Sequence, residues 1–252
     1  MDSKLRGTLQ ALAEKYETKD FIKSDPSQFM HRYKQTDDVE TAAFIAASLS
    51  FGRREQILKH VELILEQTDG SPAQWIKDGK YSSLFIDSDK SFYRMFTFKT
   101  MRLMCDRLRE ILQKEKTLGA YFESVYQKNK KSGIHLSALI ANEFCNECSI
   151  IPHGESSANK RLNMFLRWMV RDNSPVDLGL WKWYKKTDLL IPMDTHVIQT
   201  AVQFNLLEKT ASGKMPAPTM KNALHLTEML REAFPDDPVR GDFALFDLGV
   251  NS

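Results

Sequence analysis

The chain has few cysteines, few glycines and prolines, and no long apolar run, and each shortage excludes a class of protein. Its 252 residues include only 11 Gly and 9 Pro, which excludes collagen-like and low-complexity disordered chains. The longest apolar stretch, Ala42 to Phe51, is about half as long as a membrane-spanning helix. We therefore expect no membrane partner. With 42% apolar residues, a chain of this length can bury one large core or two small ones without disulfides.

The three cysteines, Cys105, Cys145 and Cys148, are too few for a disulfide framework or for a four-cysteine iron–sulfur cluster. Cys145, Cys148 and the nearby His153 supply three of the ligands that zinc needs, and no fourth is evident. The ordinary alternative is two half-buried thiols. We expect neither a metal site nor a cofactor.

Charge is balanced over the whole chain and uneven along it. Lys and Arg total 35 against 33 Asp and Glu, so the net charge of +2 does not by itself predict a nucleic-acid partner. The segment 160–186 is basic and rich in tryptophan. Two interpretations stay open: a solvated helix face above buried tryptophans, or a surface that follows phosphates and stacks on bases. The first residues have an early acid and no apolar core of a secretory signal, so we expect a cytoplasmic protein.

Apolar residues recur at helical spacing along most of the chain and rarely alternate with period two. The pattern predicts an all-α protein with about a dozen short helices. Asp37 and Glu40 have the spacing of a capping box, and Asp194 precedes an apolar helical run. The clearest expected helices cover residues 5–16, 42–49, 57–64, 101–112, 118–126 and 136–145.

Two short segments carry the most chemical information. Residues 159–168 form a helix that opens with a lysine, Lys160, and residues 190–197 form an apolar turn that leads to Asp194 at a helix N-cap. The positive end of the helix dipole disfavours the ammonium form of a lysine in the first turn, and a neutral amine is a nucleophile. The alternative for Lys160 is an exposed surface lysine without a catalytic role. The alternative for Asp194 is a structural helix cap that stabilises the fold by about 1 kcal/mol.

Together these segments resemble the helix-hairpin-helix DNA glycosylases. Pro192-Met-Asp-Thr-His-Val197 resembles the signature that carries the catalytic aspartate of that family, and the run Lys160 to Leu166 resembles the helix that carries the lysine nucleophile of its bifunctional members. The 34 positions from 160 to 194 are more similar to the spacing of the archaeal 8-oxoguanine DNA glycosylases, which lack the iron–sulfur cluster, than to that of the endonuclease III type. Over the whole chain, residues 160–171 and 242–246 resemble an uncharacterised bacterial family, a domain of unknown function distantly similar to these glycosylases.

The resemblance implies a two-lobed, all-α glycosylase-like fold with a cleft between its lobes and no iron–sulfur cluster. One module spans 1–252, with a central lobe at 36–155, a second lobe from 1–35 and 156–252, and a hairpin-like element at 150–171. It also implies base excision with lyase activity on double-stranded DNA, where a damaged base such as an oxidised purine is flipped out of the duplex. The protein would act as a monomer associated with the nucleoid.

The resemblance assigns roles to individual residues. Lys160 would be the nucleophile, and Asp194 would stabilise the positive charge on the sugar. The implied base pocket contains Met164, Asp242 and Phe246, the implied DNA contacts are Arg53, Gly154, Asn159, Arg161 and Arg167, and Phe51 would fill the gap left by the flipped base.

One departure from the family pattern keeps two other interpretations open. The hairpin region, residues 151–159, is longer than the glycosylase hairpin and places Ser157 and Ala158 just before Lys160. This favours, as the alternative function, a nucleic-acid-binding protein on the same scaffold that no longer excises bases. A helical adaptor without a nucleic-acid role is the third interpretation.

Overall fold

The computed structural model describes residues 1–152 and 157–250, with side chains up to residue 245. The described residues are mostly helical, which confirms the all-α class. The α-helices are α1 (Ser3–Tyr16), α2 (Lys19–Ile22), α3 (Thr36–Leu49), α4 (Arg54–Leu65), α5 (Pro72–Lys77), α6 (Phe98–Lys114), α7 (Leu118–Asn129), α8 (Leu136–Asn142), α9 (Lys160–Val170), α10 (Thr195–Gln203), α11 (Met220–Arg231) and α12 (Gly241–Val250). Short 3-10 helices are η1 (Pro26–Arg32), η2 (Glu66–Thr68), η3 (Lys80–Ser83), η4 (Lys186–Asp188) and η5 (Pro238–Arg240).

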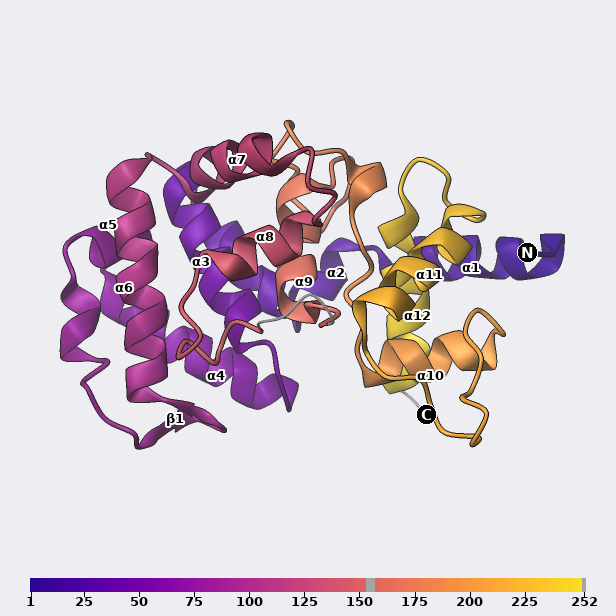
Figure 1. The fold of residues 1–252 in the computed structure, drawn as a ribbon, viewed down its shortest axis with the longest axis horizontal. Helices are drawn as coiled ribbons and strands as arrows, with labels where there is room; N and C mark the ends of the chain where they lie inside the picture. Colours follow the sequence, from indigo (N-terminus) through magenta and orange to yellow (C-terminus); the bar gives the residue numbers. More distant parts are fainter. Residues whose placement is uncertain (153–156, 251–252) are drawn as a thin grey trace. The chain divides into compact units, whose positions relative to one another are not determined.

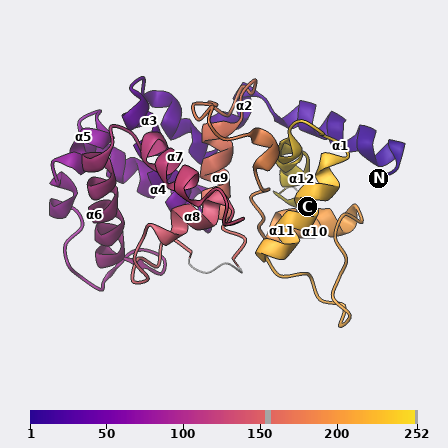
Figure 2. The same cartoon turned by 45° about the horizontal axis from the view of Figure 1, so that its top comes forward.

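The elements form two compact units (Figures 1 and 2). The terminal unit contains Met1–Lys23 and Gly154–Ser252, and the central unit contains Ser24–His153. The first division thus falls earlier in the chain than the expected boundary at 35/36, because η1 packs against α3 of the central unit. The described sheet is a small antiparallel hairpin of β1 (Ser91–Tyr93) and β2 (Phe96–Thr97) in the central unit.

The terminal unit is closed by helices from opposite ends of the chain. In Figure 1, α1 lies beside α12, and α10 also packs against α12. Apolar side chains from α1, α10, α11 and α12 make one core, because each helix presents one buried apolar face. The core includes Leu9, Ala13, Ile191, Val197, Ile198, Ala201, Leu226, Leu230, Ala244 and Leu245.

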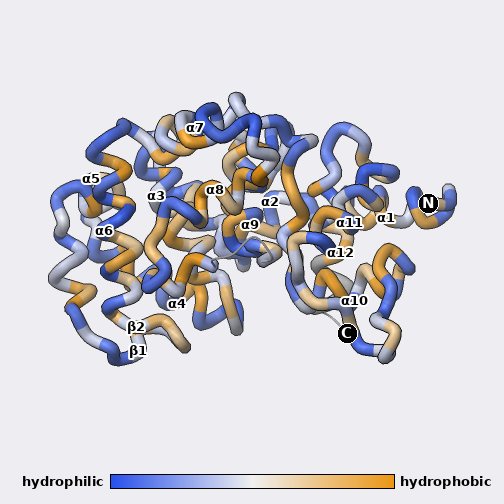
Figure 3. Tube along the Cα trace, in the orientation of Figure 1, coloured by the Kyte–Doolittle hydropathy of each residue, from blue (hydrophilic) through white to orange (hydrophobic). Residues whose placement is uncertain are grey.

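The central unit is built around α3, which is buried on nearly all sides. Apolar residues are distributed over the helices of both units rather than gathered in one long stretch (Figure 3). Among the described helices, none combines the length and the hydropathy required to cross a membrane.

Two local predictions in the central unit were wrong. The capping box expected from Asp37 and Glu40 does not form, because α3 begins earlier, after Gln35. Glu40 is instead buried, and its Oε2 accepts a hydrogen bond from the Gly119 backbone N–H at 2.9 Å. The helix expected over 136–145 ends at Asn142, so Cys145 and Cys148 follow α8 in non-helical chain.

A tight turn after α9 yields a first testable prediction. Gly179 has φ +59°, and a Cβ there would lie 2.8 Å from Asp172 Cα and 2.9 Å from the Arg171 carbonyl oxygen. Gly213 also has positive φ, +76°, but open space around it. Both alanine variants lose stability because alanine disfavours the left-handed backbone conformation. Only Gly179→Ala also introduces a steric clash with backbone atoms.

We therefore expect Gly179→Ala to lower the free energy of unfolding by about 1–3 kcal/mol more than Gly213→Ala. Urea denaturation of the two variants measures this difference. Equal losses in the two variants would contradict the packing described for this turn.

Candidate active site

Lys160 and Asp194 form an ion pair within the terminal unit. Lys160 is the first residue of α9, and Asp194 is the N-cap of α10. Lys160 Nζ lies 3.1 Å from Asp194 Oδ2, and the two side chains are 33% and 22% exposed. Two helix N-termini therefore place an amine and a carboxylate in contact, and both remain partly accessible to solvent.

Asp194 is held by its helix as well as by the lysine. Its Oδ1 accepts a hydrogen bond from the Val197 backbone N–H at 2.9 Å, which confirms the predicted N-cap. Burial raises the pKa of Asp194, but the Lys160 ammonium and the Val197 N–H outweigh this effect, so the pKa lies below its usual value. Asp194 is therefore an ionised carboxylate at neutral pH.

A second carboxyl group belongs to the same electrostatic cluster. Asp242, in the first turn of α12, is only 7% exposed, and its Oδ2 accepts a hydrogen bond from Arg167 Nη1. Burial, together with the Asp194 carboxylate, raises the pKa of Asp242 to about 6, although Arg167 and Lys160 oppose the rise. Two carboxyl groups in one site thus have pKa values shifted in opposite directions.

One face of α9 joins these groups. Lys160, Met164 and Arg167 are spaced at i, i+4 and i+7, which places them on one side of the helix. Lys160 contacts Asp194, Arg167 contacts Asp242, and the half-buried Met164 lies between them along the helix. The side chain of Phe246 lies outside the described residues.

Two of the expected DNA contacts are buried. Arg167 is 3% exposed, and its Nε lies 3.3 Å from Asp177 Oδ1 while its guanidinium also lies over the Phe243 ring. Asn159 is 1% exposed and turns the chain into α9 with φ +46°. These two expected DNA contacts are therefore side chains that the fold covers, and their role in DNA binding stays a prediction. Gly154 lies outside the described residues, and Arg161 is half-buried.

The basic segment 160–186 is in part a buried charge cluster, which neither sequence interpretation included. Arg171 is 1% exposed, and it forms ion pairs with Asp177, with Asp237 at 2.8 Å and with Glu17 at 2.8 Å. Arg240 also pairs with Glu17, at 2.8 Å. Trp168 and Trp181 are core residues, as the ordinary interpretation expected.

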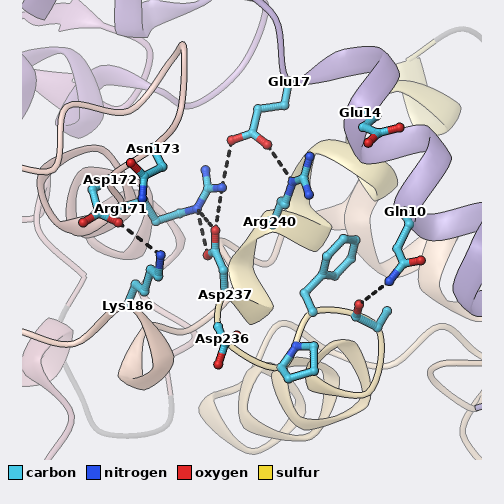
Figure 4. A pocket seen from close by; sticks show the side chains of 13 residues that line it. Gln10, Glu14, Glu17, Arg171, Asp172, Asn173, Lys186, Asp236, Asp237 and Arg240 are labelled. Carbon is cyan, nitrogen blue, oxygen red and sulfur yellow. Dashed lines mark hydrogen bonds and ion pairs between the residues drawn. The ribbon is translucent and has the colours of Figure 1, made fainter.

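Asp177 links this cluster to the Lys160 site. One of its oxygens pairs with Arg167 and the other with Arg171. Beyond Arg171, the cluster reaches a cavity of about 500 Å³. Figure 4 shows Glu17 and Asp237 converging on Arg171 at the wall of this cavity.

Sequence reasoning missed Glu17, Asp177 and Asp237, because nothing in the local pattern tells a buried partner from a surface acid. The available signal was the spacing of Arg167 and Arg171, which share a helix face four residues apart.

The expected gap-filling turn is exposed in the central unit. Phe51 is 41% exposed, and the Arg94 guanidinium lies over its ring at 4.8 Å. The Tyr93 hydroxyl donates a hydrogen bond to the Phe51 carbonyl oxygen, which ties the turn to the β1–β2 hairpin. Arg53 next to it is exposed.

The fold and the site together define an all-α protein with a lysine and two carboxyl groups at the N-termini of α9, α10 and α12. Within the described residues, no group of three or more His, Cys, Asp or Glu side chains is arranged to hold a metal ion. The chain belongs to the DUF2400 family, described as a protein of unknown function, whose match covers residues 25–251. No curated protein and no solved structure matches the chain significantly.

Proposed function

We propose that the protein is a DNA base-excision glycosylase with lyase activity, in which Lys160 is the nucleophile and Asp194 the charge-stabilising carboxylate. The observation that carries the proposal is the 3.1 Å contact between the Lys160 amine and the Asp194 carboxylate at two helix N-termini. The resemblance of both segments to the helix-hairpin-helix glycosylases supports it, and the proposal includes that fold.

The chemistry requires the target base to leave the duplex, because a stacked base hides the C1′ atom of its sugar. Nζ of Lys160, as the neutral amine, attacks C1′ while the bond to the base breaks. Asp194 is ionised at neutral pH, and a carboxylate in this position stabilises the positive charge that develops on the sugar. The resulting Schiff base permits strand cleavage by β-elimination.

The remaining predicted contacts fit a double-stranded DNA partner. Phe51 has an exposed aromatic ring that the Arg94 guanidinium covers on one side. Such a ring can stack between bases and take the place of a flipped base. Arg53 and Arg161 supply positive charge for phosphates. We propose that the protein acts as a monomer on chromosomal DNA in the cytoplasm.

Borohydride trapping tests the proposal directly, because hydride reduces a Schiff base to a stable covalent link. The wild-type protein is incubated with duplexes that carry 8-oxoguanine or an abasic site. We expect a covalent protein–DNA adduct on the abasic duplex. DNA binding without any adduct would replace the enzyme with the non-catalytic DNA-binding alternative, and the absence of both would contradict both functions.

Salt dependence of DNA binding gives another prediction. Binding through a few phosphates releases counterions, so the affinity for a duplex with an abasic-site analogue should fall roughly tenfold or more between 50 and 200 mM salt. Fluorescence anisotropy of a labelled duplex measures this change. An affinity that is independent of salt would exclude phosphate contacts and support the helical adaptor.

A further inference from the structure

We infer that Asp242 is the proton donor to the departing base, an assignment that rests on the proposed glycosylase function. Lys160 and Asp194 provide a nucleophile and a stabilising charge, but neither provides an acid for the leaving group. An uncharged purine that leaves without gaining a proton leaves as an anion, which is a poor leaving group. A proton donor to one of its nitrogens lets it leave as an uncharged base. Asp242 is the remaining acid of the cluster.

The position of Asp242 follows from the helices that surround it. Its helix α12 packs against α10, whose N-cap is Asp194, and its carboxyl is bound to Arg167, two turns after Lys160 on the same face of α9. Seven residues of α-helix rise about 10 Å, so Lys160 and the Arg167 that binds Asp242 lie at two points along one face of α9. The coupling of its charge to both Asp194 and Lys160 agrees with this placement.

Among the described residues, the charged groups that act on Asp242 directly come from α9 and α10. Arg167 and Lys160 face it from α9, and Asp194 faces it from α10. Asp177 acts on Arg167 from the loop after α9. The charged groups at the end of α1 and in η5, Glu17 and Arg240, pair with each other and with Arg171.

These neighbours leave Asp242 able to hold a proton near neutral pH. Burial and the Asp194 carboxylate raise its pKa to about 6 against the pull of Arg167. Among the described residues, Arg167 is the hydrogen-bonding partner of this carboxyl, through Oδ2. We assign the proton that moves to a bound base to the other carboxyl oxygen, Oδ1.

The protons balance over three steps, which are release of the base, transfer of a proton from the ammonium, and formation of the Schiff base. After the Lys160 ammonium has lost one proton to water, its lone pair forms the bond to C1′, and the electron pair of the C1′–N bond leaves with the base. The Asp242 proton moves to a nitrogen of that base. The Asp242 carboxylate then takes one proton from the alkylated ammonium. Finally the nitrogen lone pair forms the C=N bond, the C1′–O4′ bond breaks, and O4′ takes the proton back from Asp242.

The test compares a reaction that needs a leaving-group proton with one that does not. Release of 8-oxoguanine from a duplex requires the donor, whereas trapping on a preformed abasic site does not involve a departing base. We expect Asp242→Asn to slow single-turnover release roughly 100-fold and to slow abasic-site trapping less than tenfold. Asp242→Glu, which keeps a carboxyl group, should recover at least part of the release rate, and the exposed Asp236→Asn serves as the matched control.

The pH dependence of the release rate distinguishes a proton donor from a residue with only a structural role, because a structural residue would not change the shape of the profile. The rate of release should fall as the pH rises above about 6, because Asp242 loses its proton. In Asp242→Asn this break near pH 6 should disappear.

Three results would overturn the assignment. They are an equal loss of release and trapping, a break near pH 6 that survives in Asp242→Asn, and a wild type that traps on abasic DNA but releases no 8-oxoguanine. Failure of the wild type to trap at all would instead overturn the proposed function itself, so the two failures are distinguishable.

Discussion

Replacing Lys160 by glutamine is expected to remove the borohydride-trapped adduct, lowering its rate of formation by roughly a thousandfold or more. The amide of glutamine has no nucleophilic lone pair and cannot form a Schiff base. It can still donate a hydrogen bond to Asp194, and it suits the first turn of a helix as well as lysine does. The variant should therefore keep its fold and lose its chemistry.

The matched control for this prediction is Lys182→Gln. Lys182 lies in the same unit, is exposed, and pairs at the surface with Asp172 at 3.1 Å. It should form the adduct at the wild-type rate. An adduct that survives in Lys160→Gln and disappears in Lys182→Gln would assign the chemistry to another lysine and refute the proposed site.

Arg171→Met is expected to have the largest effect on stability, lowering the free energy of unfolding by about 3–5 kcal/mol. The guanidinium is buried among three carboxylates, those of Glu17, Asp177 and Asp237. Without the Arg171 guanidinium, the three carboxylates keep too few positive partners. The Asp177 side chain is also fully shielded from water, so solvent cannot stabilise its charge. Methionine fills most of the volume, so the loss reports mainly on the charge.

Lys186→Met is the control for Arg171→Met. Lys186 makes one surface ion pair, with Asp172 at 3.1 Å, and such pairs contribute about 0–1 kcal/mol. Urea denaturation of both variants measures the difference. A loss in Arg171→Met no greater than in Lys186→Met would contradict the buried cluster.

Helical periodicity was sufficient to predict the all-α class and most of the helices, because each helix must bury one apolar face. The N-cap role of Asp194 was also predictable, since it depends on a local pattern of a polar residue before an apolar run. The capping box at Asp37 and Glu40 failed because a contact distant in sequence, with Gly119, determines the position of Glu40.

The burial of Arg167 could not be predicted from the sequence. Arginine is usually exposed, and its buried partners Asp177 and Asp242 are 10 and 75 residues away. The raised pKa of Asp242 comes mainly from its burial, which only the folded chain produces. The sequence thus placed Lys160 and Asp194 at helix N-termini, while their electrostatics depend on tertiary packing.

The most direct test of the central claim is to map the trapped adduct to a residue. Wild-type protein is reduced with borohydride on an abasic duplex and digested, and the modified peptide is sequenced by mass spectrometry. We predict a sugar-derived mass on Lys160, in the peptide that opens α9. A modification on any other lysine, or no modified peptide, would contradict the assignment of Lys160 as the nucleophile.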